Sequence, residues 1–218
     1  MEHKSRLESI ISLYREGAVN SKGDRRVLQI IEVAVELIAR DGYAALDFAD
    51  LAKKCKITRP LIHHYFAKKE QLFSSLVQYV GIEHQKYIIA ALSKNEKSGR
   101  SLLRAYLRSN MTWPKERRSH SRVWMHYLAL SASQNEARRE NTLSVDHGAQ
   151  RIWEILQIGA RNNEWASEKL LEKARTLQIV LSGAVISLIT EERTDEEAQF
   201  LLQIVLGQAE LILGTKIE

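Results

Sequence analysis

The sequence contains little that would interrupt a helix or cross-link the chain. Its 218 residues include one cysteine, two prolines and ten glycines. The single Cys55 excludes an intrachain disulfide and a cysteine-rich zinc site, and it fits a reducing compartment. Because prolines and glycines are so few, the sequence predicts long helices.

Long apolar runs are missing as well. No stretch of about 18 unbroken apolar residues occurs, so we expect no membrane span. The opening "MEHKSRLESI" is charged and lacks the apolar core of a signal peptide. With 44% hydrophobic and 27% charged residues, the composition is that of an ordinary globular protein. We therefore expect a cytoplasmic protein.

The positive charge is concentrated near the N-terminus. Residues 22–69 hold ten Lys/Arg and six Asp/Glu, a surplus of four. Residues 98–218 hold 16 basic and 15 acidic residues, a surplus of one, within a total net charge of +5. If the protein has an anionic partner, this bias favours its N-terminal part.

After an arm at residues 1–23, four helices are predicted. Asp24 is expected to cap the first helix, which ends at Asp41-Gly42 with the glycine in a left-handed conformation. Asp47 caps a short second helix, "FADLAKKC". Thr58 caps the third, with Pro60 in its first turn, where a missing N–H costs nothing. The fourth is predicted from Lys68 to about Ser93.

The third helix has two contrasting sides. At about 100° per residue, Ile62 and Phe66 share the side expected to be buried. The outward side carries Pro60, Leu61, His63 and His64, with Arg59 and Tyr65 at its edges. Two short helices joined by a tight link, with such an outward side on the second, are typical of a helix-turn-helix.

A metal site at His63-His64 is the competing interpretation. Adjacent residues on a helix diverge by about 100°, so they do not converge on one ion without a further ligand. His120, His126 and His147 are scattered, and no G-x-S-x-G, P-loop or G-x-G-x-x-G motif is present. The sequence therefore predicts no metal site, no cofactor, no catalytic residue and no enzyme.

Residues 27–77 resemble the DNA-binding domain of TetR-family transcriptional regulators. The resemblance rests on Asp41-Gly42-Tyr43, Leu51-Ala52, Ile57-Thr58, the aromatic end His64-Tyr65-Phe66, and Lys69 followed by Leu72. It implies an all-α protein. An N-terminal three-helix helix-turn-helix DNA-binding domain at 24–75, whose fourth helix continues to about 93, precedes a larger helical-bundle domain at 76–218 for ligand binding and dimerisation.

Some positions depart from the family pattern. Lys56 stands where the family usually has glycine, and a lysine with positive φ there would cost about 1 kcal/mol. Ala49 occupies an often basic site, Lys68 replaces a small polar cap, and His63 replaces a common tyrosine. Lys56 and Ala49 favour an alternative, a TetR-like ligand-binding or interaction protein that has lost specific DNA binding.

The resemblance implies an operator of double-stranded DNA as partner. The residues best placed for base edges in the major groove are Arg59, Pro60, Leu61 and His64. Those better placed for phosphates are Lys56, Thr58, His63, Tyr65 and Lys69.

The rest of the chain predicts further helices at 101–113, 119–138, 141–162, 167–191 and 194–214. A group of bulky side chains there either packs a core or lines a cavity for an apolar effector of unknown identity: Tyr106, Met111, Trp113, Trp124, Met125, Tyr127 and Trp153. Arg122, His126 or Arg151 would supply a polar contact to that effector.

The last two helices are unusually apolar and contain small residues. They either complete the core or, as the resemblance implies, contribute to a four-helix homodimer interface through Leu181, Gly183, Ala184, Leu188, Leu202, Val205, Leu206 and Ala209. The expected function is a homodimeric repressor that a small-molecule effector releases from its operator by population shift.

Overall fold

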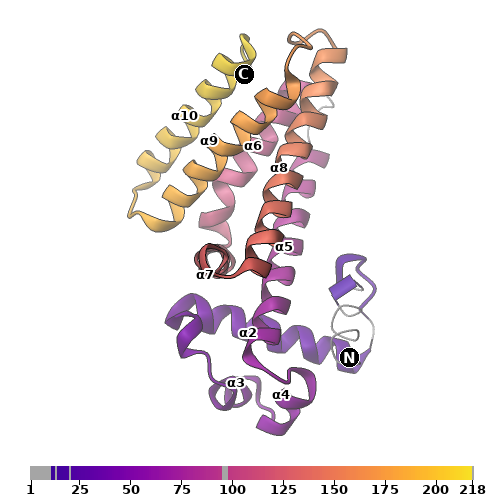
Figure 1. Ribbon diagram of the computed structural model, residues 1–218, viewed down its shortest axis with the longest axis vertical. Helices are drawn as coiled ribbons and strands as arrows, with labels where there is room; N and C mark the ends of the chain where they lie inside the picture. Colours follow the sequence, from indigo (N-terminus) through magenta and orange to yellow (C-terminus); the bar gives the residue numbers. More distant parts are fainter. Residues whose placement is uncertain (1–10, 13, 20, 95–97, 218) are drawn as a thin grey trace. The chain divides into compact units, whose positions relative to one another are not determined.

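The computed structural model describes residues 11–12, 14–19, 21–94 and 98–217, and this part of the chain is helical with no strand. The first ten residues of the predicted arm lie outside the described residues. The elements, drawn in Figure 1, are α2 (Lys22–Ala45), α3 (Phe48–Cys55), α4 (Arg59–Tyr65), α5 (Lys69–Ser93), α6 (Gly99–Glu116), α7 (Arg118–Ser133), α8 (Asn135–Arg161), α9 (Leu170–Thr190) and α10 (Asp195–Leu213). The predicted all-α fold with an N-terminal helix-turn-helix is confirmed.

The chain folds into two compact units. The first contains residues 1–85 together with Arg117–Tyr127, and the second contains Lys86–Glu116 together with Leu128–Glu218. Helices α5 and α7 therefore each contribute residues to both units. The sequence predicts a single boundary at residue 75. It contains no signal that the chain returns to the first unit at the beginning of α7.

Helix α2 provides the main apolar face of the first unit. Val27, Ile30, Ile31 and Ile38 are fully buried, as their helical spacing predicts. The predicted cap is wrong by three residues, because Ser21 precedes the helix and its Oγ accepts a hydrogen bond from the Asp24 N–H at 3.0 Å. A serine hydroxyl satisfies an N-terminal amide as well as an aspartate does.

Gly42 interrupts α2 before its last turn. Its φ of 83° confirms the predicted positive φ, but its ψ of 163° is extended rather than left-handed helical. This combination is open almost only to glycine. The chain therefore changes direction here and makes one more helical turn before α3.

The N-terminal segment is anchored to the first unit. The side chain of Ile11 is buried, and the Tyr14 hydroxyl donates to Glu83 Oε1 at 2.6 Å. Tyr14 also packs on Tyr79, with ring centroids 5.1 Å apart. The part of the predicted arm that the structure describes is thus held by α5.

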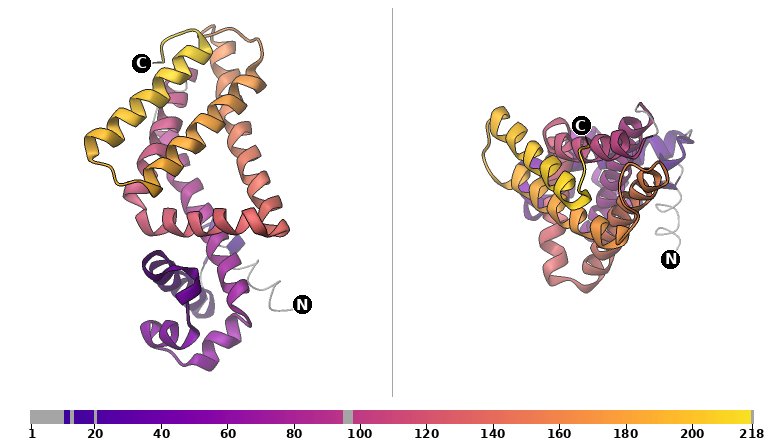
Figure 2. Two further views of the ribbon diagram at one scale, coloured as in Figure 1. Left: turned by 60° about the vertical axis from the view of Figure 1, so that its left-hand side comes forward. Right: turned by 90° about the horizontal axis from the view of Figure 1, so that it is seen from above.

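The second unit is a helical bundle built from α6, α8, α9 and α10 with the last turns of α5. Its core contains Leu103, Leu107, Ile152 and Leu156, and α9 and α10 lie side by side in the views of Figures 1 and 2. By length and composition alone, α9 could also cross a membrane, with 22% of its apolar stretch buried in this chain. One such helix is weak evidence, because core helices pass the same test.

Two helix boundaries differ from the prediction. Helix α6 continues through Pro114 to Glu116. The break predicted near residue 140 lies instead at Gln134, where the Arg138 guanidinium donates to the carbonyl oxygens of Ser131 and Ala132 at 3.2 and 2.7 Å. An arginine that bonds the last carbonyls of one helix while it begins the next fixes the turn between them.

Candidate nucleic-acid interface

Helices α3 and α4 form the predicted helix-turn-helix. Asp47 caps α3 by accepting from the Ala49 N–H at 3.2 Å. Lys56 ends the helix in the left-handed conformation, at φ 55° and ψ 44°, and the Ile57 N–H donates to the Ala52 carbonyl at 3.0 Å. The tight turn is therefore formed although its left-handed position holds a lysine rather than a glycine.

Helix α4 is anchored by two side chains. Ile62 and Phe66 are both fully buried, as predicted, and the Phe66 N–H closes the helix on the Ile62 carbonyl at 2.8 Å. Thr58 occupies the predicted cap position, although its side chain makes no capping hydrogen bond. The short helix is thus held by packing more than by its ends.

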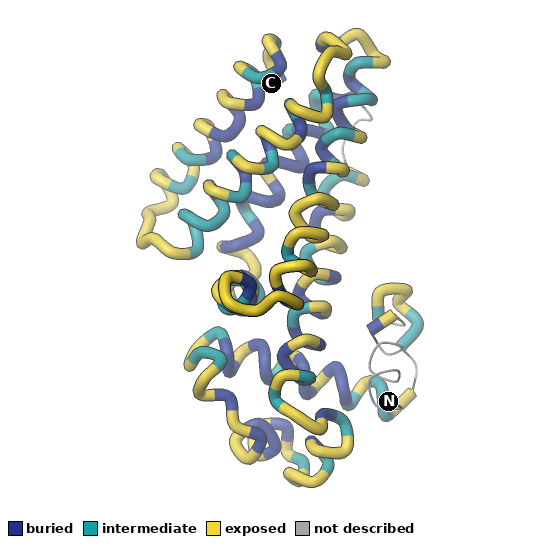
Figure 3. Tube along the Cα trace, in the orientation of Figure 1, coloured by how far each residue is buried: buried dark blue, intermediate teal, exposed yellow. Residues whose placement is uncertain are grey.

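The opposite side of α4 faces outward (Figure 3). The exposed residues are Lys56, Thr58, Arg59, Pro60, His63 and His64, while Leu61 and Tyr65 are half-buried. Between Asp50 and Glu70 the sequence has no acidic residue. This side therefore offers cationic and hydrogen-bonding groups with no carboxylate among them.

The two histidines contact different neighbours. His63 meets Phe48 edge-on with ring centroids 5.0 Å apart, and His64 meets Tyr65 at 5.1 Å. Among the described residues, no group of three or more His, Cys, Asp or Glu is placed to hold a metal ion. The two histidines therefore pack against different aromatic rings, one on α3 and one on α4 itself.

Lys69 has contacts that its sequence position did not indicate. Its Nζ donates to the Ala44 carbonyl at 2.9 Å and lies 4.7 Å from the centroid of the Tyr43 ring. Tyr43 in turn packs on Phe73 at 4.5 Å. The side chain thus ties the start of α5 to the end of α2, and two of its three ammonium donors remain for an outside anion.

The predicted effector residues are divided between the two units. Tyr106, Met111, Trp113 and Trp153 belong to the second unit, whereas Trp124, Met125 and Tyr127 lie on the part of α7 that belongs to the first. Tyr106 and Met111 are buried in the core of the second unit, and Trp153 packs against it. Burial raises the pKa of the Tyr106 hydroxyl, whereas the charge of Arg151 and a hydrogen bond with Asn110 act to lower it. Tyr106 and Asn110 are thus buried polar residues of this unit, and half-buried Arg151 acts on the tyrosine through its charge.

Most of the predicted dimer residues are buried within the single chain. Six of them lie in its core: Leu181, Ala184, Leu202, Val205, Leu206 and Ala209. Leu188 packs against that core, and only Gly183 is exposed. The outer face of these helices is formed by other residues.

That outer face is apolar and was missed in the sequence. It carries Ile179, exposed to 72%, Phe200 to 68% and Leu211 to 75%, with Ile204 between the last two. A Cβ added at Gly183 or Gly207 would meet nothing within 4 Å. The spacing of Phe200, Ile204, Gly207 and Leu211 as i, i+4, i+7 and i+11 is the signal that would have identified this face.

The fold and the turn at Lys56 define an all-α protein with an N-terminal helix-turn-helix. Residues 30–76 match the family model described as "Bacterial regulatory proteins, tetR family". The uncharacterized HTH-type transcriptional regulator YuxN of Bacillus subtilis (strain 168) is 40% identical over 50 residues, which cover 23% of this chain and 17% of that protein. The family match thus covers the helix-turn-helix of α3 and α4 and concerns that part of the chain.

Most of the chain is similar in fold to solved structures. A transcriptional regulator from Saccharomonospora viridis in complex with choline matches with a TM-score of 0.75 and 21% identity, over 84% of this chain and 95% of that one. AibR, in complex with isovaleryl coenzyme A and operator DNA, matches with a TM-score of 0.64 and 17% identity, over 87% and 97%. At these identities the likeness concerns the fold alone.

Proposed function

We propose that the protein is a homodimeric, sequence-specific DNA-binding transcriptional regulator, a repressor released from its operator by a small molecule. One observation carries the proposal. Helix α4 and its C-cap bury Ile62 and Phe66 completely and leave the opposite side exposed, and residues 51–69 contain no acidic residue. A helix supported in this way fits the major groove of DNA.

The outward residues divide into two roles. Arg59, Pro60, Leu61 and His64 contact base edges, with the arginine suited to guanine and the apolar side chains to thymine methyl groups. Lys56, Thr58, His63, Tyr65 and Lys69 contact phosphates at the rim of the groove. For Lys69, the bond to the Ala44 carbonyl supports this role, since it fixes the ammonium at the first turn of α5.

The dimer forms through the outer face of α9 and α10. Its large side chains are Ile179, Phe200, Ile204 and Leu211, and an apolar patch of this kind is typical of an interface. Exposed Gly183 and Gly207 allow a second copy of the two helices to approach closely. Two recognition helices about 34–36 Å apart would then read successive turns of the duplex.

The effector is a small molecule bound in the second unit. The solved relatives described above include one with choline and one with isovaleryl coenzyme A. In this chain buried Tyr106 and Asn110 supply polar groups beside an apolar core, the combination that small-molecule sites use, and half-buried Arg151 adds a positive charge. An effector favouring a dimer whose recognition helices are wrongly spaced releases the operator.

The alternative is a TetR-like protein that no longer binds DNA specifically. Ala49 and Lys56 are the positions that favour it. Lys56, however, adopts the left-handed conformation that the turn requires, so Ala49 is the one of these two positions that still favours the alternative. The alternative therefore loses half of its sequence basis.

The test is fluorescence anisotropy with DNA fragments that flank the protein's own gene, over a range of salt concentrations. We expect Arg59→Ala to weaken binding to the specific fragment by about 1–3 kcal/mol while binding to random DNA stays the same. Arg139→Ala, at an exposed arginine of α8, is the matched control. If no fragment is bound more tightly than random DNA, the alternative holds.

A further inference from the structure

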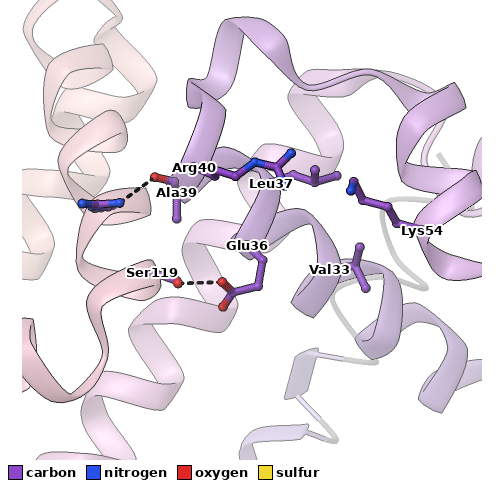
Figure 4. Close-up of a pocket in the computed structure, with 8 residues that line it drawn as sticks. Val33, Glu36, Leu37, Ala39, Arg40, Lys54 and Ser119 are labelled. Carbon is purple, nitrogen blue, oxygen red and sulfur yellow. Dashed lines mark hydrogen bonds between the residues drawn. The ribbon is translucent and has the colours of Figure 1, made fainter.

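The first unit has a hollow on the side of α2 that carries Val33, Leu37 and Arg40. Lys54 of α3 and Ser119 of α7 complete it, and its volume is about 360 Å³ (Figure 4). All of these residues belong to the same compact unit. The hollow is therefore a feature of one folded body and has the size of a small-molecule site.

The two ends of the hollow differ in charge. At one end the Glu36 carboxylate accepts a hydrogen bond from Ser119 Oγ at 2.8 Å, and the guanidinium of Arg122 donates to the Ala39 carbonyl at 3.3 Å. The Glu36 carboxylate would repel an anion, and the Arg122 guanidinium already donates to the Ala39 carbonyl. This end is consequently closed to an anionic group.

The other end is cationic. Figure 4 shows the ammonium group of Lys54 turned toward Arg40, with Leu37 beside them. Arg40 pairs with Asp41, which lies outside the lining, and Asp50 acts on Arg40 from a greater distance. Within the described part of the chain, Lys54 has neither an ion pair nor a side-chain hydrogen bond. The pKa of Asp41 is lowered, first by the hydrogen bond from Arg40 and also by the charge of Lys54, which places that lysine within electrostatic reach.

We propose that this hollow binds a small organic anion, with its carboxylate or phosphate group between Lys54 and Arg40 and its apolar body on Val33 and Leu37. Lys54 is the principal contact, because Arg40 is already shared with Asp41. Val33 is half-buried and Leu37 is buried, and both line the hollow, so an apolar body replaces water there at a gain. The site is separate from the effector site proposed in the second unit.

Occupancy would bridge three helices, α2, α3 and α7. Helix α3 is the first helix of the helix-turn-helix, and α7 is already tied to α2 through Ser119 and Glu36. An anion in the hollow therefore stabilises one arrangement of these helices over others. That this changes DNA affinity rests on the proposed function, whereas the binding itself does not.

The test is a titration of the full-length protein, without DNA, by two-dimensional amide NMR. The probes are phenyl phosphate, benzoate, inorganic phosphate and uncharged phenol. We expect saturable shifts at Val33, Leu37 and Ser119 with phenyl phosphate, benzoate or both, and no saturation with phenol. A response to phenyl phosphate alone identifies a phosphate ligand, and a response to benzoate alone a carboxylate.

Lys54→Gln and Lys53→Gln form a matched pair, because both lysines are exposed and adjacent on α3 and only Lys54 lines the hollow. We expect Lys54→Gln to weaken anion binding about fivefold, as for a good exposed ion pair, and Lys53→Gln to leave it unchanged. Equal weakening by both, or no saturable shift at the hollow with either organic anion, overturns the proposal. If Lys54→Gln weakens DNA binding while neither anion binds, the cations serve a DNA phosphate and the proposal also fails.

Discussion

Replacing Lys56 by glycine should stabilise the helix-turn-helix. Lys56 lies at φ 55° and ψ 44°, a conformation that costs a residue with a Cβ about 1–2 kcal/mol. Glycine adopts it freely but loses about 0.5–1 kcal/mol more backbone entropy on folding. The Lys56 N–H that bonds the Lys53 carbonyl at 3.2 Å is kept in glycine, and the lysine side chain is exposed. The net expectation is a gain of about 0.5–1 kcal/mol.

The gain should be measured locally, because two compact units need not unfold together. Native-state hydrogen exchange at the amides of Leu51 and Ile62, both in buried positions of the helix-turn-helix, reports on this region directly. Urea unfolding followed at the same time gives the global value. Lys53→Gly is the matched control: Lys53 is inside α3, where glycine should cost about 1 kcal/mol.

Opposite signs for these two variants are the essential result. If Lys56→Gly and Lys53→Gly destabilise the region alike, the lysine conformation carries no strain and the reasoning is wrong. The same variant also tests the phosphate contact of Lys56. If the lysine neutralises one phosphate, the slope of log affinity against log salt concentration becomes shallower by about 0.9 in Lys56→Gly.

The remaining predictions concern the interface, the core and pH. Phe200→Glu should disrupt the proposed dimer, because burial of the 68% exposed Phe200 in the interface is worth roughly 3 kcal/mol per protomer. Sedimentation velocity should then show a monomer. The control variant Gln199→Glu should remain dimeric. Ile62→Ala should lower the free energy of unfolding of the helix-turn-helix by about 2–5 kcal/mol in hydrogen exchange, because its side chain is fully buried. Burial lowers the pKa of His120 on folding, so the protein should lose stability as pH falls below the unfolded-state value of about 6.5 and on through the folded pKa. The thermal midpoint of His120→Phe should depend less on pH between 7 and 5, and an unchanged dependence would contradict this.

The helix-turn-helix could be predicted from sequence because its determinants are local. Caps such as Asp47 act within three residues, and the helical phase alone assigns Ile62 and Phe66 to the buried side of α4. The displaced cap of α2 shows the limit of such reasoning. Ser21 and Asp24 are both good capping residues, and only the backbone geometry decides between them.

Contacts between distant segments could not be predicted in this way. Lys69 bonds a carbonyl 25 residues earlier, and Ser119 bonds Glu36 across 83 residues. Both contacts depend on how the chain returns to the first unit, for which the local sequence contains no signal. The aromatic residues of α7 were therefore grouped with those of α6, although the compact units separate them.

The last two helices show why composition predicts an interface without locating it. A helix that is apolar on nearly all sides must be covered on nearly all sides. In α10 one stripe, including Leu202, Val205 and Ala209, is covered by the chain itself, and the stripe of Phe200, Ile204 and Leu211 is not. The interface was predicted from small and branched apolar residues, and these lie on the inner stripe. Tight packing favours the same residue types in a core and between subunits. Only the phase of the helix relative to its own core distinguishes the two, and in the proposed dimer that phase assigns the contact with a second copy to the outer stripe.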